Sequence, residues 1–186
     1  MKNVLIVDGY TDEPSMFGVP PYISPYVRYI YGAVLDAGGN PRYITIDKFR
    51  ELTDQEKEKT LTWSDITVIH RGVIVPGKYM GGSPIKFNEI ISIASKSRGL
   101  VVLGGSVASY GFGGIGGKRP IPPSEVKNYV DYLVAEDVDA FVYDLIKYGK
   151  ASQRYRSKEE WFVWAIKGAK LVKEHDWYPH VICEIE

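Results

Sequence analysis

The sequence predicts an α/β protein of the Rossmann-like, flavodoxin-like type: a doubly wound, mainly parallel five-stranded sheet with a C-terminal helical extension. Short β-branched apolar runs alternate with segments of helical periodicity, and Gly or Pro marks most of the joints. Such alternation implies right-handed crossovers and helices on both faces of an open sheet. We assign residues 1–150 to this domain and residues 151–186 to a helical linker and the start of a further domain.

The first half of the chain supplies four strands. Residues 3–8 form a continuous apolar run that stops at Gly9, as expected of a parallel strand buried on both faces. Apolar side chains recur at helical spacing over residues 24–37, and Gly38-Gly39 ends that helix. A strand, a charged helix, a strand, a helix and a strand are then predicted over residues 43–46, 47–59, 65–70, 85–97 and 99–103.

The second half completes the sheet and adds the extension. A Gly-rich loop and a Pro-rich connection precede a strand over residues 132–135 and a helix over 137–148. An aromatic helix over roughly residues 157–173 contains Trp161 and Trp164, and we expect it to pack on this domain or on the next one. The final apolar run, residues 180–186, has no polar end, which predicts that the protein continues beyond it.

Composition argues against several classes of function. Lys plus Arg and Asp plus Glu both total 23, so no net charge attracts nucleic acid or an anionic membrane. No apolar run approaches the roughly 18 residues of a membrane span, and the first apolar run is too short for a secretory signal. The single cysteine, Cys183, can form no internal disulfide and makes a poor metal site. We therefore expect a cytoplasmic protein with no nucleic-acid or membrane partner and no metal ligands.

The candidate site lies at the carboxyl ends of the strands, where ligands of open α/β sheets bind near the switch in strand order. Residues 8–21, 71–84 and 104–118 leave this edge, and each segment is longer than the usual connection of about 2–6 residues. The candidate ligand-binding residues in them are Asp8, Tyr10, Arg71, Gly104, Gly105 and Ser106. The two glycines either let a bulky ligand approach the backbone or form a tight turn. Alternatively, the loops form a rim for another domain.

Other polar residues have two interpretations each. His70 ends the third strand and either faces a ligand or is merely hydrogen-bonded. Asp12 and Glu13 either hold a cation or a hydroxylated ligand, or are solvated loop charges. His175 and His180 are expected on the linker surface.

No catalytic residue is predicted. Residues 111–116 satisfy Gly-x-Gly-x-x-Gly but neither follow a strand directly nor open a helix, and Lys118 lacks the flanking residues of a P-loop. Ser106 lacks the second glycine of a nucleophile elbow, and no histidine stands in a convincing triad order. Cys183 lies in an apolar strand rather than on the strand-to-helix turn that a glutamine-amidotransferase nucleophile requires.

Four short segments point to a known family. They are Val-Asp-Gly-Tyr at residues 7–10, Gly-Val-Pro-Pro-Tyr at 18–22, Gly104-Gly105, and Val-Ala-Glu-Asp at 134–137. Together they resemble the N-terminal cobalamin-binding-like domain of radical S-adenosylmethionine proteins, particularly archaeal ones, and the resemblance covers the whole chain. It implies that residues 181–186 begin the first strand of a radical S-adenosylmethionine barrel, which would be the partner of this domain. The cysteines that hold the 4Fe–4S cluster then lie beyond Cys183, as does the S-adenosylmethionine site.

The resemblance also implies a cofactor, cobalamin, but this chain departs from the family's cobalamin-binding motif. An Asp-x-His-x-x-Gly loop supplies an axial histidine in the family, whereas Tyr10 and Glu13 replace its histidine and glycine in this chain. The family's Ser-x-Leu element is replaced around residues 71–73, and Gly104-Gly105 remains to flank a corrin. The resemblance thus implies cobalamin bound without a histidine, or a domain that binds another small molecule, substrate, or nothing.

The resemblance therefore implies a non-catalytic ancillary domain, for ligand binding or as a lid, of an iron–sulfur enzyme of the oxidoreductase type that uses S-adenosylmethionine. The alternative is a freestanding module that binds or senses a nucleotide-like or cobalamin-like ligand. A third interpretation is a structural interaction domain, which would expose the tryptophans of the last helix as a docking face.

Overall fold

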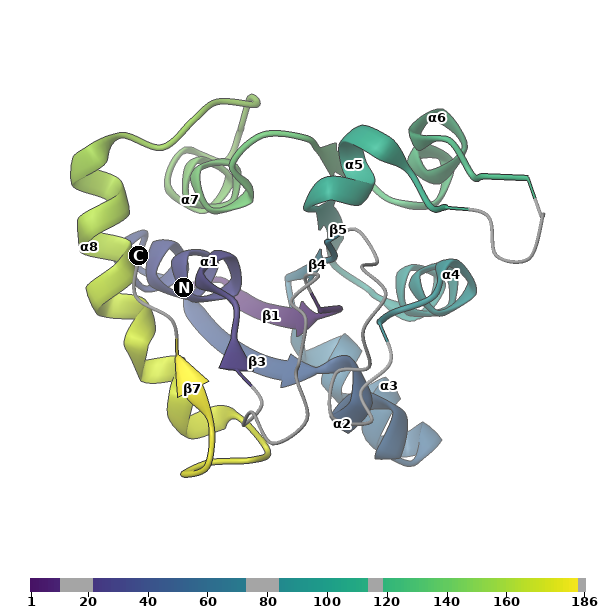
Figure 1. The fold of residues 1–186 in the computed structure, drawn as a ribbon, viewed down its shortest axis with the longest axis horizontal. Coiled ribbons are helices and arrows are strands. Elements are labelled where there is room, and N and C mark those ends of the chain that lie inside the picture. The colour runs from purple at the N-terminus through teal and green to yellow at the C-terminus, as the bar shows by residue number, and fades with distance from the viewer. Residues whose placement is uncertain (11–21, 73–83, 114–118, 184–186) are drawn as a thin grey trace.

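A computed structural model describes residues 1–10, 22–72, 84–113 and 119–183, and Figure 1 shows the fold. Five parallel strands form the central sheet in the order β3-β1-β4-β5-β6. Their bounds are β1 (Asn3–Asp8), β3 (Asn40–Thr45), β4 (Ile66–His70), β5 (Leu100–Gly104) and β6 (Tyr132–Val134). Counted along the chain within this sheet, the order is the flavodoxin-like 2-1-3-4-5. The predicted fold class is confirmed.

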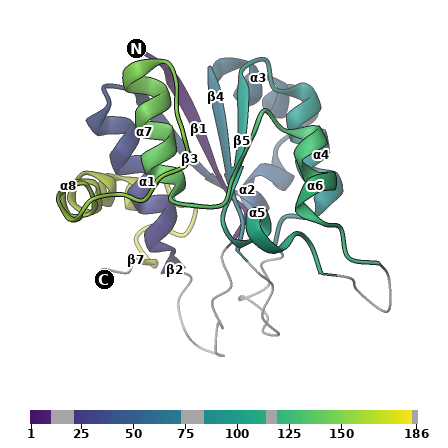
Figure 2. The same cartoon turned by 90° about the horizontal axis from the view of Figure 1, so that it is seen from above.

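Helices cover both faces of the sheet (Figure 2). On one face lie α1 (Pro25–Asp36) and α7 (Val138–Tyr148), and on the other lie α3 (Asp54–Trp63), α4 (Phe87–Lys96) and α6 (Pro123–Val126). Alternate residues of β1 serve the two layers: Val4 and Ile6 pack toward α1 and α7, whereas Leu5 and Val7 pack toward α3 and α4. The central strands are therefore apolar on both sides, as their sequences predict.

Several boundaries differ from the sequence-based prediction. The charged helix expected over residues 47–59 is two helices, α2 (Ile46–Glu51) and α3, because Thr53 starts a new helix with a capping box to Glu56. The expected Gly-rich loop begins with a short helix, α5 (Ser106–Tyr110). Strand β3 starts earlier than expected and includes Pro41, which an edge strand tolerates because its outer side needs no donor.

The extension is a helix that crosses α1 at close range. Helix α8 (Lys158–Gly168) is followed by the 3₁₀ helix η2 (Ala169–Glu174), where a single helix was expected. A Cβ atom added to Gly32 would lie 2.0 Å from the carbonyl oxygen of Trp164, and one on Gly168 would lie 1.9 Å from that of Arg28. Glycines on both helices therefore permit the contact, which buries Trp164 completely.

Polar groups fix the same crossing. The Nε atom of Arg28 donates to the carbonyl of Ala165 at 2.7 Å, and the indole of Trp161 donates to the hydroxyl of Tyr29 at 2.9 Å. The indole of Trp164 donates to Asp36 at 3.1 Å. Both tryptophans pack on α1, so the exposed tryptophan face expected of a structural interaction domain is not seen; the large apolar side chains that α8 does expose include Phe162 and Ile166.

The end of the described chain returns to the start of α1. Strand β7 (Ile182–Cys183) pairs in parallel with β2 (Tyr22–Ile23), which directly precedes α1. The predicted strand over residues 180–186 is thus present at 182–183, and residues 184–186 lie outside the described part of the chain. Within the described ranges, no helix is both long and apolar enough to cross a membrane.

The α1–α8 crossing predicts a large effect of one added methyl group. We expect Gly32→Ala to lower the free energy of unfolding by about 1–3 kcal/mol, because overpacking against backbone outweighs the helix propensity gained. Gly113→Ala is a matched control, since a Cβ there meets nothing within 4 Å. Urea denaturation of both variants measures the difference, and equal stability would contradict the close contact.

Candidate functional site

The carboxyl edge of the sheet carries a row of buried polar side chains. Asp8, the last residue of β1, pairs in register with Thr45 of β3 on one side and with His70 of β4 on the other. We call Thr45, Asp8 and His70 the polar row; they are 2%, 2% and 4% exposed, respectively. Gly104 of β5 pairs with His70 and continues the same line.

The polar row faces α1. Side chains two residues earlier on the same strands, among them Ile6 and Val68, belong to the core beneath α1 and α7, and strand alternation places the row on that face. The chain passes from β1 to β3 on one side and then to β4 on the other, so β1 and β4 flank the switch in strand order. This is the position at which open α/β sheets bind ligands.

Asp8 is held by two donors and has an altered acidity. Its Oδ1 accepts from the backbone N–H of Tyr10 at 3.0 Å, and its Oδ2 accepts from the hydroxyl of Tyr43 at 2.7 Å. Burial raises the pKa of Asp8 to about 6, and these two hydrogen bonds only partly oppose the rise. Asp176 adds a smaller repulsion in the same direction.

His70 is neutral near pH 7 and incompletely satisfied. Burial lowers its pKa to about 4, since no carboxylate of the described chain pairs with the imidazole to offset the loss of water. Among the described residues its Nδ1 is buried with no hydrogen-bond partner. The ring of Tyr26, in the first turn of α1, stacks on the imidazole with centroids 5.5 Å apart and planes at 18°. Such an unpartnered atom costs about 1–3 kcal/mol, which makes it a natural anchor for a ligand or water.

Ser106 supplies a second unpartnered atom at the same edge. Its Oγ is buried and, within the described ranges, makes no hydrogen bond. It lies two residues after Gly104, whose strand neighbour is His70. Because α5 has only five residues, its N-terminus is no anion site in itself.

The two glycines are required by packing. A Cβ on Gly104 would lie 2.1 Å from a methyl of Val138 in α7, and one on Gly105 would lie 2.2 Å from the carbonyl oxygen of Arg71. Gly105 also has a φ of +91°, which L side chains rarely adopt. A role in letting a ligand approach the backbone stays a prediction, since the tight turn already explains both glycines.

Tyr10 and Arg71 are committed to the opposite face of the sheet. Tyr10 is buried in the core with φ of 66°, and its hydroxyl donates to Asp47 at 2.8 Å. The Arg71 guanidinium stacks on Phe112 at 4.4 Å and donates through Nε to the carbonyl of Ile85 at 2.8 Å. The structure thus brings Asp8, His70 and Ser106 to one edge and holds Tyr10 and Arg71 on the other side.

The order Asp, His, Ser across neighbouring strands is not a hydrolytic relay. Both oxygens of Asp8 are engaged by Tyr10 and Tyr43, and neither His70 Nδ1 nor Ser106 Oγ has a partner in the part of the chain that the structure describes. A triad needs a base bonded to the nucleophile and to an orienting carboxylate. In the same part of the chain, no group of three or more His, Cys, Asp or Glu side chains is arranged to hold a metal.

A second polar group ties the C-terminal segment to the row. Glu174 accepts from the backbone N–H of Tyr43 at 2.7 Å and from the hydroxyl of Tyr31. His175, expected on the linker surface, is instead 6% exposed and stacks on Tyr43, because η2 lies against β3. Asp176 accepts from Thr45 at 3.3 Å. The sequence alone did not indicate these contacts; its only signal was the unusual density of polar residues at 174–176.

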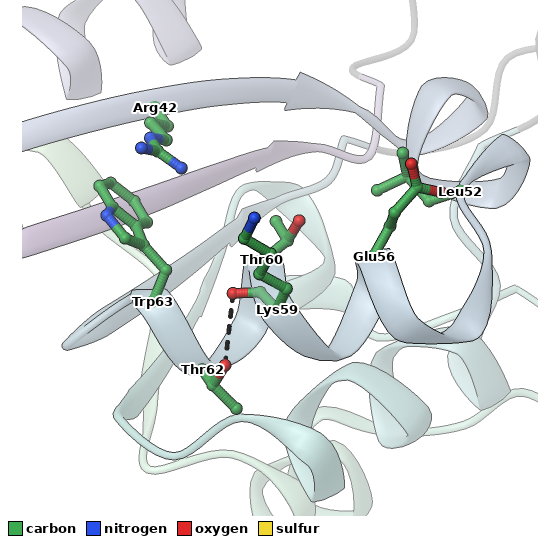
Figure 3. Close-up of a pocket in the computed structure, with 7 residues that line it drawn as sticks. All are labelled: Arg42, Leu52, Glu56, Lys59, Thr60, Thr62 and Trp63. Atoms are coloured by element: carbon green, nitrogen blue, oxygen red, sulfur yellow. Dashed lines mark hydrogen bonds between the residues drawn. The ribbon is translucent and has the colours of Figure 1, made fainter.

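An open groove lies elsewhere, between β3 and α3 (Figure 3). It measures about 520 Å³, and the guanidinium of Arg42 stacks 3.9 Å from the ring centre of Trp63 at one end. Arg42 lies three residues before the carboxyl end of β3, so the groove is separate from the polar row. Its mixed lining of Lys59 and Glu56 indicates no particular ligand. Asp12 and Glu13 lie outside the described residues.

Comparisons with known proteins give long relatives of unknown function. No protein-family model matches the chain. An uncharacterized protein of Methanocaldococcus jannaschii is 43% identical over 189 residues, covering 99% of this chain and 34% of that protein. An uncharacterized protein of Archaeoglobus fulgidus is 36% identical over 182 residues, covering 97% of this chain and 31% of that protein. The chain spans about a third of the length of the curated relatives it matches.

Among solved structures, the chain resembles part of the radical S-adenosylmethionine methyltransferase TsrM of Kitasatospora setae. The structure with its tryptophan substrate and a S-adenosylmethionine analog bound matches with a TM-score of 0.52 and 14% identity, over 82% of this chain and 27% of that one. At this identity the similarity establishes a shared fold. A structure of TsrM with cobalamin and a 4Fe–4S cluster bound has a TM-score of 0.48 and 15% identity, over 81% and 25% of the two chains.

The polar row predicts two opposite pH dependences of stability. Folding raises the pKa of Asp8 to about 6, so its contribution to stability is full at low pH and is lost as the pH rises from about 4 to 6. Folding lowers the pKa of His70 to about 4, so its contribution is full above about pH 6.5 and is lost as the pH falls toward 4. In the wild-type protein the two slopes largely cancel.

Single substitutions should separate the two pH dependences. As the pH falls from 6.5 to 4, we expect the free energy of unfolding of Asp8→Asn to fall relative to wild type, because only the His70 contribution remains. We expect that of His70→Gln to rise, because only the Asp8 contribution remains; each change reaches up to about 3 kcal/mol. Chemical denaturation at several pH values measures both slopes. The exposed Glu58→Gln should leave the wild-type profile unchanged. Slopes of the same sign in the two variants would contradict the assignment.

Proposed function

We propose that the chain is a ligand-binding ancillary domain of a longer protein of the radical S-adenosylmethionine type and that it supplies no catalytic residue. The observation that carries this proposal is the buried polar row at the switch in strand order, with His70 Nδ1 and Ser106 Oγ unpartnered in the described chain. Binding sites of open α/β sheets lie at this position. Unsatisfied buried polar atoms there are a sign of a partner that hydrogen-bonds to them.

The size of the relatives supports an ancillary role. Because the chain covers only 34% and 31% of its two curated relatives, most of each relative is left for other domains. The fold shared with TsrM, itself a radical S-adenosylmethionine methyltransferase, supports a domain that uses S-adenosylmethionine as the partner. The carboxyl edge of this domain would then cover the mouth of the barrel and keep water from its radical intermediates.

Cobalamin is the candidate ligand, but the residues do not fit histidine-ligated cobalamin. The residue at the position of the family's axial histidine is Tyr10, and its side chain is buried on the far face and bonded to Asp47. His70 lies on the α1 face at the end of β4, outside the loop that carries the family's axial histidine, so we do not assign it as a replacement for that imidazole. The chain therefore offers hydrogen bonds and shape to a corrin rather than a metal bond.

Titration with hydroxocobalamin tests the proposal. We expect saturable changes in corrin absorbance and a rise in melting temperature, because a ligand that binds only the folded state stabilises it, by about 2.7 kcal/mol at one hundred times Kd. We also expect the corrin spectrum to be the same with wild type and with His70→Gln. Absence of both binding signals would overturn cobalamin as the ligand, and an imidazole-bound spectrum that His70→Gln abolishes would overturn the assignment of His70.

A further inference from the structure

The two unpartnered atoms of the carboxyl edge come from the last residue of β4 and from the first residue of α5, the helix that follows β5. His70 ends β4 and pairs with Gly104, and Ser106 follows two residues later at the start of α5. His70 Nδ1 and Ser106 Oγ are both buried, and neither atom forms a hydrogen bond within the described chain. A neutral imidazole offers one acceptor nitrogen, and a serine hydroxyl can donate and accept. The pair therefore matches a group that has both a donor and an acceptor.

Burial at this edge disfavours an ionic group. Asp8 is the strand neighbour of His70, and burial raises the pKa of its carboxyl to about 6. In α7, next to Val138 that packs on Gly104, Asp139 is buried with a pKa raised to about 7 despite its ion pair with Arg156. An anion would add to this repulsion. An ammonium group would lose its water in this buried position, and it has no acceptor for the hydroxyl of Ser106.

We propose that His70 and Ser106 form a subsite for an uncharged carboxamide group of a ligand, which donates an N–H to His70 Nδ1 and accepts from the hydroxyl of Ser106. This inference deepens the proposed function and rests on it for the identity of the whole ligand, but the subsite itself is defined for any primary amide. An amide group hydrogen-bonds to both unpartnered atoms at once, and it brings no charge into the buried carboxyl edge of the sheet.

Tyr26 covers this subsite from the helix side. Its ring is stacked on the imidazole of His70, yet it is 44% exposed and lies in the first turn of α1. A half-exposed ring can rotate away without opening the core. Tyr26 is therefore the side chain that we expect a ligand to displace on entry.

Acetamide is a probe that does not depend on corrin binding. With the full chain labelled with ¹⁵N-histidine, we expect acetamide to shift the Nδ1 resonance of His70 saturably, and acetate and methylammonium at equal concentrations to bind at least tenfold more weakly. No saturable shift with acetamide would show that the two atoms hold water or nothing, which overturns the subsite. Binding of acetate or methylammonium as tight as that of acetamide would overturn its selectivity for an uncharged group.

Variants locate the subsite. Ser106→Ala should weaken acetamide binding at least threefold while the His70 resonances stay those of a folded protein. Ser95→Ala is the matched control, because that serine lies on α4 on the other face and donates to Ser92. Equal affinities of the two variants would overturn the role of Ser106. If the wild-type protein responds to acetamide but does not bind hydroxocobalamin, the cobalamin proposal is refuted and the subsite still stands.

Discussion

Burial of the central strands on both faces is the constraint on which the rest of the structure depends. β1 and β4 lie inside the sheet between two helical layers, so their side chains are apolar along most of their length until the last residue. The carboxyl end is where a polar side chain can leave the core and meet a ligand. Asp8 and His70 occupy those ends in register, and the polar row follows directly from the geometry of the sheet. The features that could bind a ligand are thus concentrated where the core stops.

The C-terminal segment of the described chain is joined to the same edge through β3. Edge strands need protection from further pairing, and here Pro41 lacks a donor while Glu174 accepts the N–H of Tyr43. The hydroxyl of Tyr43 donates to Asp8, and its ring stacks on His175. Tyr43 therefore links the carboxylate of the polar row to the segment that leads to β7.

The fold could be predicted from sequence because its signals are local. The apolar run of β1 and the helical periodicity of α1 specify elements that tertiary contacts only reinforce. The close crossing of α8 could not be predicted, because a glycine inside a helical pattern, such as Gly32, indicates by itself only a weaker helix. The structure shows that its missing Cβ makes room for the backbone of Trp164.

The candidate site was predictable in position and only partly in composition. The strand ends identify Asp8, but no local pattern tells that Arg71 points to the other face or that His175 is buried, since burial depends on neighbours distant in sequence.

Tyr10 shows how the turn after β1 fixes a side chain away from the α1 face. A tyrosine with φ of 66° is an unusual backbone for a bulky side chain, and it is held by its hydroxyl on Asp47 and by its carbonyl, which accepts from Gly72. The backbone N–H of the same residue donates to Asp8. The turn after β1 is thus fixed at three points and turns residue 10 away from the α1 face. The polar row therefore presents His70, stacked under Tyr26, on the α1 face, and the side chain of residue 10 lies on the opposite face of the sheet.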